Sequence, residues 1–167
     1  MAPIQLHTKN LILNLLTRED TLAMVDAMSP ENRAEVSEEW LAALRASDST
    51  DPWRHGFCMV HERTGHSVGK CGFKGPPADG VVEIAYFVEP EQQGKGYATE
   101  AAEALTNFAF SHDVRTVRAH TLPKRNASTR VLTKCGFLHV GNVIDPEDGP
   151  VWRWERHRQQ PQELPIS

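Results

Sequence analysis

A strand-like segment that stops at a proline and enters a helix-like segment through two glycines restricts the fold of this chain more tightly than any other. Residues 81–88 read VVEIAYFV, a β-branched and aromatic run typical of a strand. Pro90 ends the run, because proline cannot donate a backbone hydrogen bond to a neighbouring strand. Gly94 and Gly96 follow, and the next apolar side chains recur at helical spacing: Ala98, Ala101, Ala102, Leu105, Phe108 and Ala109. The pattern predicts a strand joined by a tight turn to a helix that packs closely on the sheet.

Apolar periodicity in the rest of the chain predicts a mixed α/β fold. Two helices are expected early in the chain, separated at Ser29-Pro30-Glu31, where proline favours a helix start. A two-residue period then predicts three consecutive strands, which form an antiparallel meander most naturally. Strands are predicted at residues 9–15, 56–60, 67–73, 81–88, 114–122, 137–144 and 151–155, and helices within 17–47, from the glycine turn to Ala109, and at 127–135. The order β-αα-βββ-α-β-α-ββ predicts a mixed sheet in which an antiparallel meander is followed by a parallel crossover.

Length and charge restrict the domain count and the kind of partner. A single domain is expected over residues 1–157, followed by a flexible tail over residues 158–167 that is rich in glutamine and proline. The 18 Lys and Arg against 22 Asp and Glu give a net charge of −4, which disfavours a nucleic-acid partner. No apolar run approaches the roughly 20 residues that a membrane-spanning helix needs, so no membrane partner is expected.

The cysteine and histidine patterns predict neither disulfides nor a metal. Cys58, Cys71 and Cys135 are odd in number, widely spaced and set in apolar segments, which is typical of reduced core thiols. The histidines show no paired short spacing of the His-Glu-x-x-His kind. The first residues lack the pattern of a secretion signal, in which a basic stretch precedes an apolar one, so the protein is expected in the cytoplasm. The expected oligomeric state is a monomer or a homodimer.

The turn from Gln93 to Ala98 is suited to a pyrophosphate. It exposes backbone N–H groups at the positive end of a helix dipole, the glycines permit close approach, and Lys95 adds a charge. A P-loop would need Ser or Thr directly after Lys95, where Gly96 stands. A dinucleotide-binding fingerprint would need Gly or Ala at Thr99 and a preceding βαβ unit, whereas a meander leads into this turn.

The segment Gln93-Gly94-Lys95-Gly96-Tyr97-Ala98 resembles the coenzyme A turn of the GNAT superfamily of N-acetyltransferases, which reads Gln or Arg, two residues, Gly, one residue, Gly or Ala. The resemblance runs from Leu11 to about Trp154 and includes the Glu-Ile-Ala-Tyr strand before the turn. The block from Asn126 to Phe137, NASTRVLTKCGF, is similar to the RimJ and RimL branch, the ribosomal-protein N-terminal acetyltransferases.

This resemblance implies acetyl-CoA as donor and a GNAT fold in which strands 81–88 and 114–122 diverge at a central splay. Pantetheine would lie between these strands, near the backbone of Phe87 and Val88, and contact Asn126, while the glycine turn would take the diphosphate. The residues implied to bind the donor are Phe87, Val88, Gln93, Gly94, Lys95, Gly96, Tyr97, Ala98, Thr99, Asn126 and Arg130. Lys124 and Arg125 are further candidates for the ribose phosphate.

A primary amine, either a protein N-terminus or a small molecule, is the acceptor that the resemblance implies. Glu83 is the first candidate for a catalytic base, because a carboxylate within an apolar strand is costly to bury without a partner. The alternatives are an outward-facing polar residue and a partner for an arginine. The usual acid of the superfamily is a tyrosine at the position that Leu132 occupies, and Ser128 is the substitute, unless it merely caps its helix.

The charge distribution and the tryptophans bear on the acceptor. Residues 17–55 hold four basic and nine acidic side chains, so Glu35, Glu38 and Glu39 either attract a cationic amine or form solvated helix faces. Four tryptophans are candidates for the wall of an acceptor cleft or for simple packing: Trp40, Trp53, Trp152 and Trp154.

The predicted activity is acetyl transfer by direct attack in a ternary complex. The alternatives are a non-catalytic acyl-CoA-binding module and a scaffold that binds another nucleotide.

Overall fold

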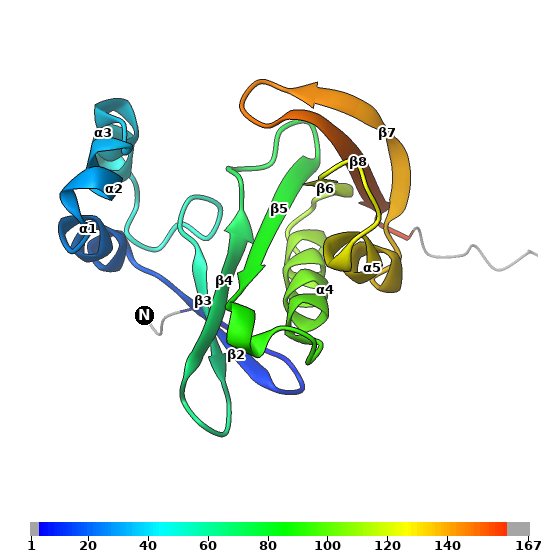
Figure 1. The fold of residues 1–167 in the computed structure, drawn as a ribbon, viewed down its shortest axis with the longest axis horizontal. Helices are drawn as coiled ribbons and strands as arrows, with labels where there is room; N and C mark the ends of the chain where they lie inside the picture. Colours follow the sequence, from blue (N-terminus) through cyan, green and yellow to red (C-terminus); the bar gives the residue numbers. More distant parts are fainter. Residues whose placement is uncertain (1–3, 160–167) are drawn as a thin grey trace, which may run out of the picture.

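The computed structural model describes residues 4–159, whose strands form a single eight-stranded mixed sheet in the order β1-β2-β3-β4-β5-β6-β8-β7 (Figure 1). The strands are β1 (Gln5–His7), β2 (Leu11–Leu15), β3 (Phe57–His61), β4 (Ser67–Phe73), β5 (Val81–Val88), β6 (Thr116–Thr121), β7 (Leu138–Asp145) and β8 (Gly149–His157). The helices are α1 (Arg18–Asp26), α2 (Pro30–Ala34), α3 (Glu38–Ala46), α4 (Tyr97–Phe110) and α5 (Ala127–Lys134), with a short 3₁₀ turn η1 at Pro90–Gln92. Figure 1 shows α4 and α5 on one side of the sheet and α1–α3 on the other.

The predicted mixed α/β class is confirmed, with two differences in detail. A short strand, β1, precedes the first predicted strand and pairs antiparallel with β2. The segment predicted as two helices folds into three, because Ser37 begins a new helix by accepting a hydrogen bond from the Trp40 backbone N–H at 3.0 Å. The predicted flexible tail falls almost wholly on residues 160–167, which lie outside the described part of the chain.

The sheet opens between β5 and β6, where the predicted parallel crossover is found. These two strands pair only over Val81–Glu83 and Thr116–Arg118, although β5 continues to Val88. On its other side β5 pairs antiparallel with β4 from Ile84 to Val88. The distal half of β5 therefore has one paired edge and one edge that no strand of residues 4–159 covers, which is the splay expected from the family resemblance.

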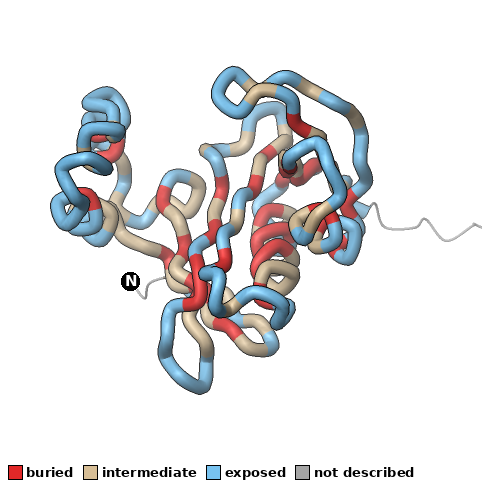
Figure 2. The backbone as a smooth tube through the Cα atoms, in the orientation of Figure 1, coloured by how far each residue is buried: buried red, intermediate tan, exposed pale blue. Residues whose placement is uncertain are grey.

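The main core lies between α4 and the sheet, and Figure 2 shows the inner face of α4 as a buried stripe. Ala101, Ala102 and Ala109 are completely buried, so the small side chains bring the helix close to the strands. Val25, Leu41 and Leu44 form a separate small cluster among the early helices. No helix in residues 4–159 has the length and apolar character that crossing a membrane would take.

Candidate functional site

The glycine turn is exposed and leads directly into α4. Gly94 and Gly96 have φ of +79° and +86°, a left-handed conformation that glycine adopts without a steric penalty. Gly96 is the N-cap of α4 and provides no side-chain hydrogen bond to the helix. The Glu100 N–H donates the first backbone hydrogen bond of the helix to the Gly96 carbonyl. A Cβ built on either glycine has no heavy atom of the described residues within 4 Å. Backbone N–H donors at the start of α4 thus face open space at the positive end of the helix dipole.

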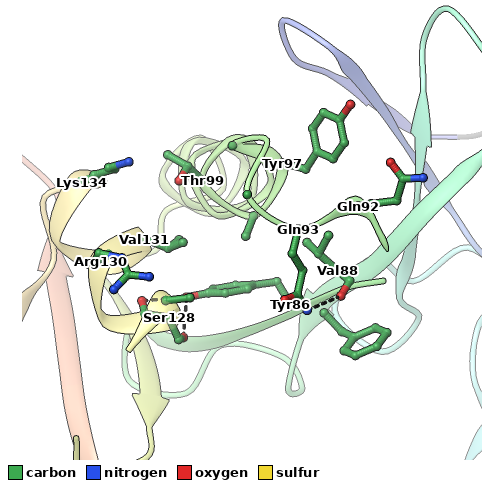
Figure 3. Close-up of a pocket in the computed structure, with 15 residues that line it drawn as sticks. Tyr86, Val88, Gln92, Gln93, Tyr97, Thr99, Ser128, Arg130, Val131 and Lys134 are labelled. Carbon is green, nitrogen blue, oxygen red and sulfur yellow. Dashed lines mark hydrogen bonds between the residues drawn. The ribbon is translucent and has the colours of Figure 1, made fainter. Parts of the chain in front are cut away.

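A groove of about 370 Å³ runs from this turn along β5 to the start of α5 (Figure 3). It brings together most of the residues predicted to bind a donor, with Ser128. Its lining consists of Tyr86, Phe87, Val88, Gln92, Gln93, Gly94, Gly96, Tyr97, Ala98, Thr99, Ala127, Ser128, Arg130, Val131 and Lys134. The β5 edge, the glycine turn and two helix starts are therefore parts of one hollow surface.

Two predicted donor-binding residues lie outside this lining. The Lys95 ammonium donates to Gln92 Oε1 at 3.1 Å and so lies along the turn. The Asn126 side chain accepts from the Thr129 backbone N–H at 3.0 Å, and Thr129 Oγ1 accepts from the Asn126 backbone N–H at 2.9 Å. Asn126 is thus the N-cap of α5 in a reciprocal capping box, which fixes the start of the helix that carries Ser128.

Backbone groups of β5 line the groove as well. The Glu83 carbonyl accepts from the Lys74 N–H at 2.9 Å, and the Glu89 N–H donates to the Val68 carbonyl at 2.8 Å, so odd-numbered residues face β4. By the alternation of an antiparallel pair, the polar groups of Tyr86 and Val88 face the uncovered edge. The Val88 carbonyl accepts from Gln93 Nε2 at 3.1 Å. An extended ligand could therefore hydrogen-bond to the Tyr86 backbone as an added strand does.

Two hydroxyls meet at the inner end of the groove. Tyr86 Oη lies 3.0 Å from Ser128 Oγ (Figure 3). Burial raises the pKa of Tyr86 to about 12, although the hydrogen bond with Ser128 acts in the opposite direction. The hydroxyl therefore stays protonated at neutral pH and can donate a proton. Asn126 caps α5, so Ser128 is not its N-cap, and Leu132, at the superfamily's usual tyrosine position, is completely buried.

Sequence reasoning missed Tyr86, although a signal was present. It is one of two tyrosines in the chain and stands two residues before Val88, on the same edge and face of a predicted strand. Its neighbour Ser128 is separated from it by 42 positions in the sequence, and only the crossover through α4 and β6 brings them together.

A smaller hollow of about 100 Å³ adjoins the hydroxyl pair and contains the Glu83 carboxylate. Glu83 Oε2 lies 3.2 Å from Lys74 Nζ and 3.1 Å from His120 Nδ1, so its partners are a lysine and a histidine instead of an arginine. His120 Nδ1 is buried, and His120 Nε2 accepts a hydrogen bond from Arg153 Nε at 3.1 Å. A neutral His120 ring thus carries its proton on Nδ1, facing Glu83.

Three hollows are joined by shared residues. Tyr86 and Ser128 line both the groove and the Glu83 hollow. Lys74 lines the Glu83 hollow and also a third cavity, of about 430 Å³, beside α1 and α3. A carboxylate therefore stands between the groove beside the glycine turn and a second cavity, an arrangement that suits transfer of a group between two bound molecules. Within residues 4–159 no group of three or more His, Cys, Asp or Glu side chains could hold a metal ion.

The structure thus combines a mixed sheet that opens between β5 and β6 with a glycine turn and a helix N-terminus beside the opening. The sequence matches the family model described as the acetyltransferase (GNAT) domain over residues 3–138. The chain belongs to this acetyltransferase family.

Individual relatives agree with this assignment. The chain is 28% identical over 128 residues to the uncharacterized N-acetyltransferase YnaD of Bacillus subtilis, a match that covers 76% of this chain and 63% of YnaD. It spans between half and two thirds of the length of the first three curated relatives that it matches.

Two solved structures share the fold. A ribosomal-protein-S5-alanine acetyltransferase from Vibrio fischeri has a TM-score of 0.66 at 12% identity, covering 92% of this chain and 96% of its own. A chimera of the spermidine N-acetyltransferase SpeG from Vibrio cholerae and hSSAT has a TM-score of 0.69 at 17% identity, covering 89% and 96%. At these identities the likeness is one of fold alone.

Proposed function

We propose that this protein transfers the acetyl group of acetyl-CoA to a primary amine, by direct attack within a ternary complex. The observation that carries the proposal is the junction at Tyr86 and Ser128, through which the groove suited to coenzyme A meets the hollow that holds Glu83. Membership of the acetyltransferase family supports it. No feature of the described residues favours the alternative of a non-catalytic acyl-CoA-binding module.

The donor would be held by backbone groups and by a cationic rim. The N–H groups around Gly94 and Gly96 suit the diphosphate, and the uncovered edge of β5 at Tyr86 and Val88 suits the amide-rich pantetheine arm. Arg130 lines the same groove and is available to a phosphate oxygen. Acetyl-CoA would then place its thioester at the inner end of the groove, beside the hydroxyl pair.

Glu83 is assigned the role of base. An alkyl amine has a pKa of about 10 and is mostly protonated at neutral pH, so its nitrogen must lose a proton before it can attack. The Glu83 carboxylate accepts this proton, directly or through water. The amine nitrogen forms a bond to the thioester carbonyl carbon, the C–S bond breaks, and the electron pair leaves with sulfur. Tyr86 supplies a proton to the departing thiolate, with Ser128 as its hydrogen-bond partner, and the second proton that the acylated nitrogen loses restores the Tyr86 hydroxyl through solvent.

These contacts suit two kinds of acceptor amine, a protein N-terminus and a small molecule. The block from Asn126 to Phe137 resembles the RimJ and RimL branch, which supports the former. A cytoplasmic location and a monomeric or homodimeric state stay predictions from the sequence.

The test of the proposal is a thiol-release assay with acetyl-CoA and a panel of primary amines, using Glu83→Gln and Glu62→Gln as a matched pair. Glu62 is exposed and follows β3, away from the three hollows. We expect amine-dependent release of coenzyme A, a fall in turnover of about 100-fold in Glu83→Gln, and no change in Glu62→Gln. Affinity for acetyl-CoA should be similar in all three proteins. Full turnover in Glu83→Gln would show that another group is the base.

A further inference from the structure

We infer that the acceptor is a primary amine with a single positive charge and an aromatic or bulky apolar body, and not a polyamine. This inference rests on the proposed acetyl transfer and concerns the cavity of about 430 Å³ beside α1 and α3. Segments far apart in the sequence supply its wall: the end of β2, α1, α3, the loop before β3 and the end of β4. A cavity of this size, with a largely apolar wall, is typical of small-molecule sites.

The apolar part of the wall is large and partly exposed. Trp53 is fixed by packing on Phe73, with ring centroids 4.7 Å apart, so it offers a rigid aromatic surface. Trp40 on α3 and Met24 on α1 line the same cavity and keep 47% and 36% of their surface exposed. Because exposed apolar surface of this size is unfavourable in water, an apolar ligand that covers Trp40 and Met24 would be stabilised.

The charged part of the wall disfavours a polycation. No Asp or Glu is among the described residues that line the cavity, whereas Arg54 and Lys74 are. Each cation already has a carboxylate partner, since Arg54 Nε lies 3.5 Å from Asp51 Oδ2 and Lys74 Nζ lies 3.2 Å from Glu83 Oε2. A second or third ammonium group of a polyamine would face these cations without a free carboxylate.

The acidic residues that sequence analysis offered as attractors for a cationic acceptor lie elsewhere. Glu35, Glu38 and Glu39 are exposed and are not part of the cavity wall. Arg33 Nη2 lies 3.4 Å from Glu38 Oε1 on the surface. Their exposure agrees with the second of the two interpretations, solvated helix faces.

The cavity directs one amino group to the reaction centre. Lys74 lines both this cavity and the Glu83 hollow, so the two spaces adjoin. Glu83 lines the smaller hollow, whereas the aromatic side chains of Trp40 and Trp53 line the larger cavity. An acceptor would thus place its nitrogen beside Glu83 and its ring against Trp40 and Trp53.

The experiment compares the kcat/KM of phenethylamine, n-butylamine, spermidine and a short peptide with an N-terminal alanine. Phenethylamine should exceed n-butylamine by at least tenfold, since its ring is removed from water. It should exceed spermidine by a larger factor. A preference for spermidine or for the peptide would overturn the inference.

A matched pair of variants tests whether the cavity is responsible. Ala43 lines it on α3, and Ala42 is its exposed neighbour that does not. Ala43→Trp fills the cavity and should remove most of the advantage of phenethylamine over n-butylamine, while Ala42→Trp should keep it. An advantage of equal size in both variants would place the ring somewhere else.

A binding measurement separates this inference from the proposed function. If no amine is acetylated, the proposed function is wrong. Calorimetric titration of phenethylamine in the presence of coenzyme A then decides the inference by itself. Saturable binding that Ala43→Trp abolishes and Ala42→Trp keeps supports it, and absence of binding to the unsubstituted protein overturns it.

Discussion

Replacing Gly96 with aspartate tests the phosphate-binding turn. Gly96 caps α4 with φ of +86°, and a Cβ at this position would meet open space, so the substitution adds a carboxylate where the diphosphate is expected. Aspartate and asparagine both tolerate the left-handed conformation better than other side chains do. The two variants Gly96→Asp and Gly96→Asn therefore impose similar strain, a loss of about 1 kcal/mol in the free energy of unfolding, and differ in charge.

The expected effect on donor binding follows from the distance between charges. Two unit charges 4 Å apart repel by about 4 kcal/mol at an effective dielectric constant near 20, and by about 1 kcal/mol in water. Because the turn faces solvent, we expect a loss of about 1.4 to 3 kcal/mol for Gly96→Asp, which is a tenfold to more than hundredfold weaker Kd. Gly96→Asn should lose much less.

Isothermal titration with coenzyme A at moderate salt measures these affinities. Gly149→Asp is the position control, because Gly149 also has a positive φ, of +74°, and open space around it, but is the first residue of β8. It should lose stability without losing affinity. Equal affinities of Gly96→Asp and Gly96→Asn would refute the assignment of the diphosphate to this turn.

Two further predictions concern the hydroxyl pair and the anchoring of α4. Tyr86→Phe and Ser128→Ala should each lower turnover, and the fall in Tyr86→Phe should be about 100-fold. Because the two hydroxyls act as one proton donor, the double variant should lose little more turnover than Tyr86→Phe. Additive losses in the double-mutant cycle would contradict this. Burial raises the pKa of Glu100, but hydrogen bonds from Thr8 and Asn10 outweigh it, so the folded-state pKa is below 4.5. Glu100→Gln should therefore lower the free energy of unfolding at pH 7 by about 1 kcal/mol, after allowance for the partial exposure of the carboxylate. Denaturant unfolding should show this difference between the two proteins shrinking as the pH falls below 4.5. A difference independent of pH would refute the role of the charge.

Local chemistry was enough to predict most of the elements. The bounds of β4 and β5 agree with the prediction, because alternating side chains, Gly65 and Pro90 mark where these strands start and stop. Gly136 ends α5 with φ of +83°, the conformation for which a glycine was expected there. β1 was missed, since its three residues are too few for a period and it is held by pairing with β2.

The contacts of the candidate site depend on long-range packing and were less accessible from the sequence. The pattern identified Glu83 as unusual within its strand, but Lys74 reaches it from the segment just after β4, and His120 reaches it from β6. The cavity that we assign to the acceptor has a wall from several segments, of which the pattern offered only Trp40 and Trp53 as candidates. Trp154, a third candidate, is buried in the main core and bonds to Thr121 Oγ1.

A crystal structure of the protein with acetyl-CoA tests the central claim most directly. We expect the diphosphate on the backbone N–H groups between residues 93 and 98, and the thioester between β5 and β6, within reach of Tyr86 and Glu83. A diphosphate bound at another surface, with the groove along β5 left to solvent, would contradict the account.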